Sequence, residues 1–370
     1  MYYPDGDYEK RPRHARSIRR RRGLVVGIIV AVGVVIAVTG GALVATGTLS
    51  SWLHPVEDFT TAGTGSVEFT IHEGDIGEDI ARNLEEAGVT KSFDAFYRLL
   101  LKTNPSPVFI PGVYSLKQQM SASAALAALL DENNRLVNQA VIPEGTILSK
   151  VLTILAQETS IPRADFVAAA SNPQAFGLPK QAKTLEGFLF PATYNFSPNQ
   201  TADQILQQMV DRCFDDLNNA GVAPEDQWRV ITFASLIQKE SGSVKDMYKV
   251  SRVFTNRLDA DIWPSQLLES DATVAYGTGH TNMMNTTAAE RADAGNPYNT
   301  YVHPGMLSAP ISNPGADAID AALHPVAGKW LFFVAVNFDT GETVFSESLA
   351  QHERAVAQSQ EWWQAHPEYQ

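Results

Sequence analysis

The chain has 370 residues, 44% hydrophobic and 19% charged, so it is too apolar for a disordered protein and long enough for two or three domains. Residues 1–22 hold eight Lys and Arg against three Asp and Glu, which leaves 20 basic and 38 acidic residues, a net charge of −18, in the remainder. Such an acidic remainder argues against a nucleic-acid partner, because phosphate binding relies on clustered cations. The single cysteine, Cys213, excludes an intramolecular disulfide and zinc sites built on several cysteines.

An apolar run near the N-terminus predicts a membrane anchor. Residues 23–53 carry no charge, and a helix that rises about 1.5 Å per residue would cross a bilayer of roughly 30 Å within this run. Four arginines precede the run and no comparable basic cluster follows it, which places the N-terminus in the cytoplasm and the rest of the chain outside the cell membrane. The predicted parts are a cytoplasmic basic tail at 1–22, a single transmembrane helix at 23–47 and a linker at 48–65. A cleaved signal peptide is the alternative, although its apolar region is normally only about 7 to 15 residues.

Residues 66–103 have the pattern of a small module. Positions 67–71 alternate apolar and polar residues, as a half-buried strand does. Apolar residues then recur at helical spacing over 76–87, before Gly88, and again over 93–100. The pattern predicts one strand followed by two helices.

An intermediate α/β region is predicted over 104–200. It begins with a strand at 113–116 and a helix at 124–130. The segment 141–146 resembles the segment 71–75, because each has an apolar start, a Glu-Gly pair and a helical pattern after it. We interpret the two segments as related strand-turn-helix units.

The remaining domain is predicted over 201–358, and its composition and hydrophobic pattern differ from those of the region before it. The stretch 270–315 is rich in Gly, Asn, Pro and Thr, and we expect it to be an ordered functional loop. A strand at 330–336 should pair with 343–345 across a turn at 339–341. Three helices are expected before the loop, at 205–217, 228–240 and 247–258. Strands and helices in this order predict the α+β class.

Glu240 is the strongest catalytic candidate. Val230, Phe233 and Ile237 form an apolar stripe, and helical spacing places Glu240 on the same stripe. A carboxyl group that is half-buried at the C-terminal end of a helix should have a raised pKa, first through desolvation and second through the helix dipole. A raised pKa suits a general acid near neutral pH. The alternative is that Glu240 only marks the frayed edge of an amphipathic helix.

A series of motifs in a fixed order resembles the MltG/YceG-like family of endolytic murein transglycosylases. The resemblance covers roughly residues 67–356, and a series of ordered motifs is more specific than any one of them. The motifs are 143–145 (PEG), 185–194 (LEGFLFPATY), 234–240 (ASLIQKE), 253–258 (VFTNRL), 270–277 (SDATVAYG), 298–301 (YNTY), 313–315 (NPG), 324–325 (HP), 331–334 (LFFV) and Phe345.

The resemblance implies a membrane-anchored lyase that cuts nascent peptidoglycan strands between N-acetylmuramic acid and N-acetylglucosamine and leaves 1,6-anhydro-muramyl ends. It implies that Glu240 is the catalytic acid, that residues 66–103 form a LysM-like glycan-binding module, and that no metal or organic cofactor is needed. Glycan strands are the implied partner, with penicillin-binding proteins and other elongation or division proteins in the same membrane. The eight histidines show no metal-ligand spacing, and His324 and His352 are interpreted as structural side chains.

Several polar residues are secondary candidates for substrate binding, and each has a structural alternative. Ser and Asp near helix ends are common caps, and polar residues after Pro297 suit a turn. The carboxylate in the Leu-Glu-Gly motif could lie in the cleft or bind backbone amides, and the second role is favoured. The candidates are Ser241, Asp271, Tyr276, Asn299, Thr300, Tyr301 and Glu186.

Three positions depart from the pattern of the family. Gln238 stands where many relatives have Glu, which removes one candidate acid and favours Glu240. Ala192 stands where relatives often have Asp, and Glu269 stands where Gln is frequent, so these two positions leave the substrate contacts open. The competing functions are a peptidoglycan-binding scaffold without activity and a lysozyme-type hydrolase, which would leave reducing muramyl ends.

Overall fold

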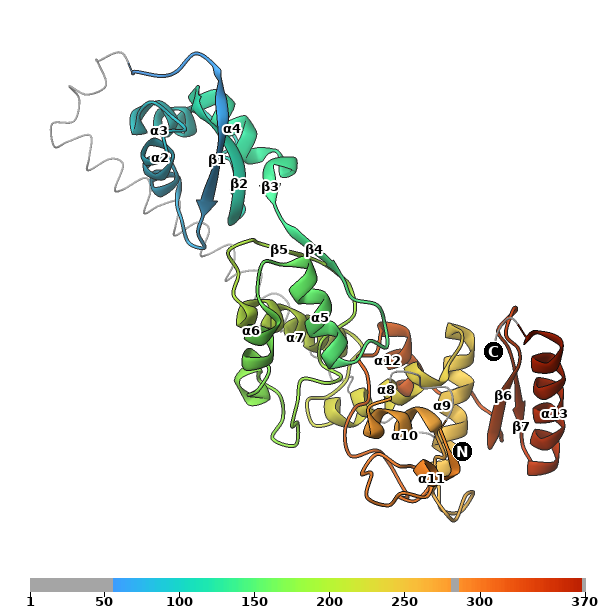
Figure 1. The fold of residues 1–370 in the computed structure, drawn as a ribbon. Coiled ribbons are helices and arrows are strands. Elements are labelled where there is room, and N and C mark those ends of the chain that lie inside the picture. The colour runs from blue at the N-terminus through green and yellow to red at the C-terminus, as the bar shows by residue number, and fades with distance from the viewer. Residues whose placement is uncertain (1–55, 281–285, 368–370) are drawn as a thin grey trace, which may run out of the picture. The chain divides into compact units, whose positions relative to one another are not determined.

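The structure, a computed structural model, describes residues 56–280 and 286–367 (Figure 1). The predicted basic tail, the transmembrane helix and residues 48–55 of the linker lie outside these residues. Within the two described ranges, no helix is both long enough and apolar enough to cross a bilayer. The described residues divide into two compact units. The first contains residues 56–67, Gly74–Phe109 and Leu116–Leu130, and the second contains Glu68–Glu73, Ile110–Ser115 and the described residues from Asp131 onward.

The first unit contains three helices that follow the predicted pattern. Ile80, Ala81 and Leu84 form the buried face of the first helix, and the backbone reverses at Gly88, whose φ is +68°. The Ser92 hydroxyl accepts a hydrogen bond from the Ala95 amide and begins the second helix. The elements are β1 (Ala62–Ile71), α2 (Gly77–Glu86), α3 (Phe93–Lys102), β2 (Gly112–Met120) and α4 (Ala122–Leu130), with β1 and β2 contributing residues to both units.

The second unit contains the other helices and strands. The three helices predicted before the functional loop are confirmed as α7, α8 and α9. The elements are η2 (Glu132–Asn134), β3 (Arg135–Leu136), β4 (Asn138–Val141), α5 (Leu148–Glu158), α6 (Arg163–Ala169), η3 (Pro173–Phe176), β5 (Thr193–Phe196), α7 (Ala202–Asn219), α8 (Gln227–Glu240), α9 (Val244–Leu258), α10 (Asp271–Thr278), α11 (Ala288–Arg291), α12 (Ala316–Leu323), β6 (Phe332–Asn337), β7 (Glu342–Ser346) and α13 (Leu349–Ala365).

The sheets of the described residues are small. One has the strand order β1-β2-β3, and the others are the antiparallel pairs β4-β5 and β6-β7. In the β6-β7 pair Phe332 lies opposite Ser346, and the turn contains Gly341 with φ +71°, so the predicted hairpin is confirmed. Helix α13 packs against β6. Figure 1 shows α13 beside the β6-β7 hairpin. The predicted α+β class is confirmed.

The two strand-turn-helix units share a local geometry. The glycine of each Glu-Gly pair has a positive φ, +91° at Gly74 and +71° at Gly145. Each helix then begins after an extended isoleucine, Ile76 before α2 and Ile147 before α5. A left-handed residue is readily adopted only by glycine, so the Glu-Gly turn reverses the chain in the same way at both sites.

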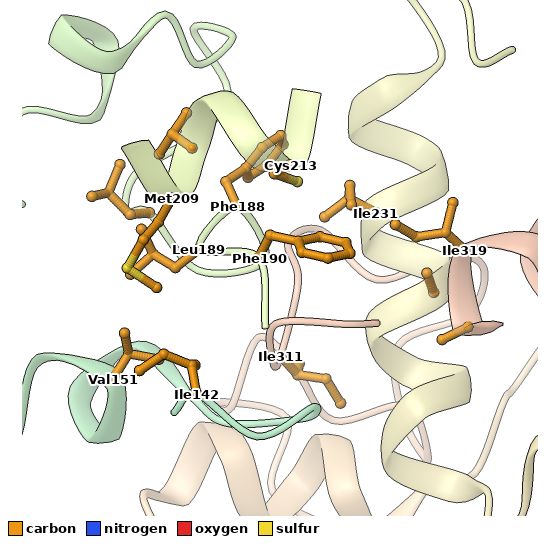
Figure 2. Packing of buried hydrophobic residues seen from close by; sticks show 14 of the residues in the cluster. Ile142, Val151, Phe188, Leu189, Phe190, Met209, Cys213, Ile231, Ile311 and Ile319 are labelled. Atoms are coloured by element: carbon orange, nitrogen blue, oxygen red, sulfur yellow. The ribbon is translucent and has the colours of Figure 1, made fainter. Parts of the chain in front are cut away.

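The core of the second unit joins helices that are distant in sequence. The labelled side chains in Figure 2 come from α5, α7, α8, α12 and the loops that precede α5, β5 and α12, and all of them are buried. Leu189 and Ile231 are fully buried, as is Ile311 from the loop before α12. Burial of such side chains contributes about 1.5 to 3 kcal/mol each. This core fixes the C-terminal half of α8, which carries Glu240.

The expected loop at 270–315 is partly helical, so that expectation was wrong in part. It contains α10 and α11. Each helix begins with a side-chain cap: the Ser270 hydroxyl accepts from the Thr273 amide, and the Thr287 hydroxyl accepts from the Glu290 amide. Helices this short have no apolar stripe, which is why periodicity did not reveal them.

Candidate active site

Helix α8 presents Glu240 as its last residue. Val230, Phe233 and Ile237 are buried along its length, and the Glu240 side chain is half-buried. Ser241 leaves the helix with φ −107° and ψ 129°, so the helix ends at Glu240. The carboxyl group therefore lies at the edge of the packed core.

The Glu240 carboxyl group meets the N-terminal end of α10. The Ser270 hydroxyl donates to Glu240 Oε1 at 2.5 Å, and the Ala272 amide also hydrogen-bonds the carboxylate. The pKa of Glu240 is raised, first because burial removes water and then because the negative charge of Asp271 lies nearby; the bonds from Ser270 and Ala272 and the charge of Arg257 oppose the rise. The raised pKa agrees with the requirement for a general acid.

Asp271 lies at the centre of a second set of polar contacts. Its Oδ1 accepts from the Tyr301 hydroxyl at 3.2 Å, from the Thr286 hydroxyl, and from Arg291 Nη1 at 3.4 Å. The Arg291 guanidinium also lies over the Tyr301 ring, 5.7 Å from its centre. The structure thus brings together Asp271 and Tyr301, two of the predicted binding residues, beside the acid.

The side chains of Asn299 and Thr300 form hydrogen bonds with other groups of the protein. Asn299 is 0% exposed, and its Nδ2 donates to the carbonyl oxygens of Glu290, Arg291 and Asp293. The Thr300 hydroxyl accepts from the Ser270 amide at 2.9 Å. Both side chains therefore hold the loop that shapes the site, and their predicted contacts with substrate stay predictions.

Glu186 joins three separate segments. Its carboxylate accepts from the Leu148 amide at 3.0 Å, from the Tyr276 hydroxyl at 3.0 Å and from Asn313 Nδ2 at 3.2 Å. The side chain is only 4% exposed, and this burial raises its pKa to about 7, although the hydrogen bonds and Lys239 oppose the rise. The binding of backbone amides, which the sequence favoured for this residue, is present.

A cavity of about 600 Å³ lies beside these residues. Lys239, the neighbour of Glu240, lines it from α8, and its Nζ donates to the Gly145 carbonyl at 3.4 Å. Tyr276 lines it from α10, one helical turn after the amide that bonds Glu240, which is a rise of about 6 Å. Residues of the PEG, LEG, QKE and SDATVAYG motifs thus surround one space: Glu144, Gly145, Glu186, Lys239 and Tyr276.

A larger cavity lies away from the acid. It has a volume of about 770 Å³ and is lined by residues of β5 and α7, among them Asn195, Gln204 and Arg212. None of the predicted site residues lines it. Its size alone therefore does not make it the candidate cleft, because Glu240 and the other predicted site residues lie elsewhere.

Ser241 follows the acid directly. Its Oγ is buried, and within residues 56–280 and 286–367 no hydrogen-bond partner reaches it. A buried hydroxyl without a partner is uncommon, and a role in the site is one explanation for it. The predicted role of Ser241 in substrate binding stays a prediction that this geometry favours.

The sequence interpretation missed three residues of the site. Ser270 was treated only as part of a motif, and its position before Asp-Ala-Thr was the available signal for a helix cap next to the acid. Arg257 is buried and donates to the Leu268 carbonyl and to Glu269 Oε2 at 3.0 Å, which explains the acidic residue at 269. For Lys239, the only feature of the sequence that indicated a place in the site was its position directly before Glu240. Among the described residues, no group of three His, Cys, Asp or Glu side chains could hold a metal ion.

Comparisons with known proteins agree with the motifs. The profile of the YceG-like family matches residues 69–358. A Bacillus subtilis (strain 168) protein named endolytic murein transglycosylase is 28% identical over 328 residues, which cover 82% of this chain and 87% of that protein. A Streptococcus pneumoniae (strain D39) protein of the same name is 26% identical over 78% of this chain and 57% of its own length. The crystal structure of a yceG-like protein from Listeria monocytogenes is 27% identical, with a TM-score of 0.50 over 79% of this chain and 99% of that one.

Proposed function

This chain belongs to the YceG-like family, and from that membership we propose that it is a peptidoglycan lytic transglycosylase that cuts glycan strands internally. The single observation that carries the proposal is Glu240: a half-buried carboxyl group with a raised pKa, held between the end of α8 and the start of α10. The names of the Bacillus and Streptococcus relatives support the reaction class.

One carboxyl group is sufficient for this reaction. Most glycosidases use two, because one protonates the leaving oxygen and the other activates water or forms a bond to the sugar. An N-acetylmuramyl unit carries its own nucleophile, the C6 hydroxyl. Glu240 gives its proton to the glycosidic oxygen as the bond from C1 to that oxygen breaks. The C6 oxygen then bonds C1, and its proton passes to the Glu240 carboxylate, so the acid is restored and no water is consumed.

The cavity beside Lys239 and Tyr276 is the proposed place for part of the glycan. It combines apolar walls from Leu148 and Ile154 with polar groups, which suits a sugar that has both a ring face and hydroxyl groups. We propose that Ser241 and Tyr276 contact the strand directly. Asp271 and Tyr301 would bind the part of the strand that lies next to Glu240.

The anchor and the accessory parts belong to the same proposal. The transmembrane helix at 23–47 would hold the enzyme at the outer face of the cell membrane, where nascent strands emerge. Cleavage there would end strand elongation beside penicillin-binding proteins and other elongation or division proteins. The strand and helices of 66–103 would bind the glycan as a LysM-like module.

Product analysis tests the proposal. Purified full-length protein in detergent is incubated with uncrosslinked glycan strands, and the fragments are identified by mass spectrometry. We expect 1,6-anhydro ends from the wild type and from Glu158→Gln, an exposed control, and a loss of at least about 1,000-fold in rate for Glu240→Gln. Reducing ends would support a hydrolase, and intact strands would support the scaffold alternative. Wild-type rates from Glu240→Gln would refute the assignment of the acid.

A further inference from the structure

The Ser270 hydroxyl group makes two hydrogen bonds, one as an acceptor and one as a donor. The Oγ accepts a hydrogen bond from the Thr273 amide at 3.3 Å as the cap of α10, and it donates to Glu240 Oε1 at 2.5 Å. The residue is 3% exposed, so water does not compete for the hydroxyl. A serine hydroxyl has one hydrogen, and because the amide already occupies a lone pair, that hydrogen points to the carboxyl group.

The backbone of Ser270 is held as firmly as its side chain. Its amide donates to the Thr300 hydroxyl at 2.9 Å, and its carbonyl accepts from the Thr273 hydroxyl at 2.7 Å. The two threonine hydroxyls are also bonded to each other at 2.8 Å. These contacts leave Ser270 one orientation, and the donor to Glu240 is therefore preset before substrate binds.

We propose that Ser270 is a positioning residue for Glu240, which keeps Oε1 as an acceptor and so places the transferable proton on Oε2. The inference rests on the proposed lyase function. An oxygen that accepts a hydrogen bond from Ser270 is the carbonyl-like oxygen of the protonated acid, so the other oxygen carries the hydrogen. When the glycosidic oxygen takes that hydrogen, the new carboxylate keeps the Ser270 bond, which is now charge-assisted and stronger. The Ala272 amide also donates to this carboxylate, and Oε2 still has a lone pair that can accept the proton of the C6 hydroxyl.

The direction of a pH effect follows from this bond. A hydrogen bond to the charged form lowers the pKa of an acid, and the Ser270 bond has this effect on Glu240. The charged groups that face Glu240 are Asp271 on α10, Arg257 on α9 and Lys239 on α8, and all three are unchanged in the Ser270 variants. The acid must be protonated to work, so activity is lost as pH rises through its pKa. Removal of the Ser270 hydroxyl raises that pKa, and the alkaline limb of the activity profile should move to higher pH.

The experiment compares four variants of the full-length protein on uncrosslinked glycan strands. Ser270→Ala and Ser270→Gly remove the donor, and glycine keeps most of the capping preference, so that loss of the fold and loss of the donor are separated. Ser270→Thr keeps the hydroxyl. Thr201→Ala removes a matched cap, since the Thr201 hydroxyl accepts from the Gln204 amide at the start of α7, away from Glu240. Rate against pH, kcat, KM and thermal midpoint are measured for each.

We expect kcat to fall at least about tenfold in Ser270→Ala and Ser270→Gly, with KM within about twofold of wild type and the alkaline limb at higher pH. Ser270→Thr should have the alkaline limb at its wild-type pH and keep most of the wild-type kcat. Thr201→Ala should lower the thermal midpoint and leave the limb unchanged. An unmoved limb in both donor-less variants would overturn the inference. Reducing ends from the wild type would instead overturn the lyase proposal, and the position of the limb would still decide the role of Ser270.

Discussion

The Tyr276 hydroxyl donates to Glu186 Oε2 at 3.0 Å, and this bond joins α10 to the loop before β5, 90 residues earlier in the chain. The same carboxylate binds the first amide of α5, at Leu148, and the side chain of Asn313. Three motifs are therefore tied together behind the cavity by one buried acid. The consequence is a dependence of stability on pH that an exposed acid would not give.

Glu186→Gln should remove that dependence. Burial raises the pKa of Glu186 from 4.5 to about 7, so the protonated form favours the folded state. Its contribution is complete below pH 4.5 and is lost as pH rises to about 7, a change on the order of 3 kcal/mol in the free energy of unfolding. Urea unfolding across this range should show a decline for the wild type and for Glu158→Gln. A decline of equal size in Glu186→Gln would contradict the assignment.

Gly187→Ala should destabilise the second unit by about 3 kcal/mol. Gly187 has φ +89°, and a Cβ there would lie 2.6 Å from Pro310 Cβ and 2.7 Å from Ile231 Cγ2. Gly177 is a matched control, because its φ is +81° but nothing lies within 4 Å of its Cβ position. Gly177→Ala should cost only about 1 kcal/mol, from backbone strain alone. Equal shifts of the urea midpoint would show that crowding against α8 is unimportant.

Asp271→Asn should move the alkaline limb of activity in the direction opposite to the Ser270 variants. The negative charge of Asp271 raises the pKa of Glu240, so its removal lowers that pKa and the acid ionises at lower pH. The rate should fall a few-fold above neutral pH and much less below it. Asp203→Asn, an exposed site in the first turn of α7, controls for net charge. An unchanged limb would indicate that Asp271 does not act on Glu240 through its charge.

Ser149→Trp should weaken the binding of glycan strands. Ser149 is an exposed residue on the rim of the cavity beside Lys239, and an indole ring there would fill part of its 600 Å³. Removal of binding that is equal in the ground state and the transition state raises KM, here by about tenfold, and leaves kcat nearly unchanged. Gln157→Trp, exposed on the same helix and outside the cavity, should have wild-type kinetics. A normal KM in Ser149→Trp would place the glycan elsewhere.

Local patterns were sufficient for much of the fold and for the position of Glu240 at the end of a helix. The stripe from Val230 to Ile237 predicted α8 and the position of Glu240 at its end, because side chains three or four residues apart lie on one face of a helix. Alternation and a turn predicted the β6-β7 hairpin. The order of the motifs identified the family, which the comparisons confirmed.

The sequence by itself determined the helices of the first unit, the helices α7, α8 and α9, and the β6-β7 hairpin, because these depend on spacing along a short stretch of chain. Only the tertiary structure decided that Ser270 bonds Glu240, that Glu186 joins Leu148 to Asn313, and that Lys239 and Tyr276 share a cavity. Ser270 lies 30 residues from Glu240 in the chain. Leu148 and Asn313 lie 38 and 127 residues from Glu186. Their meeting depends on how the core packs α5, α8 and α10, and no local pattern encodes that packing.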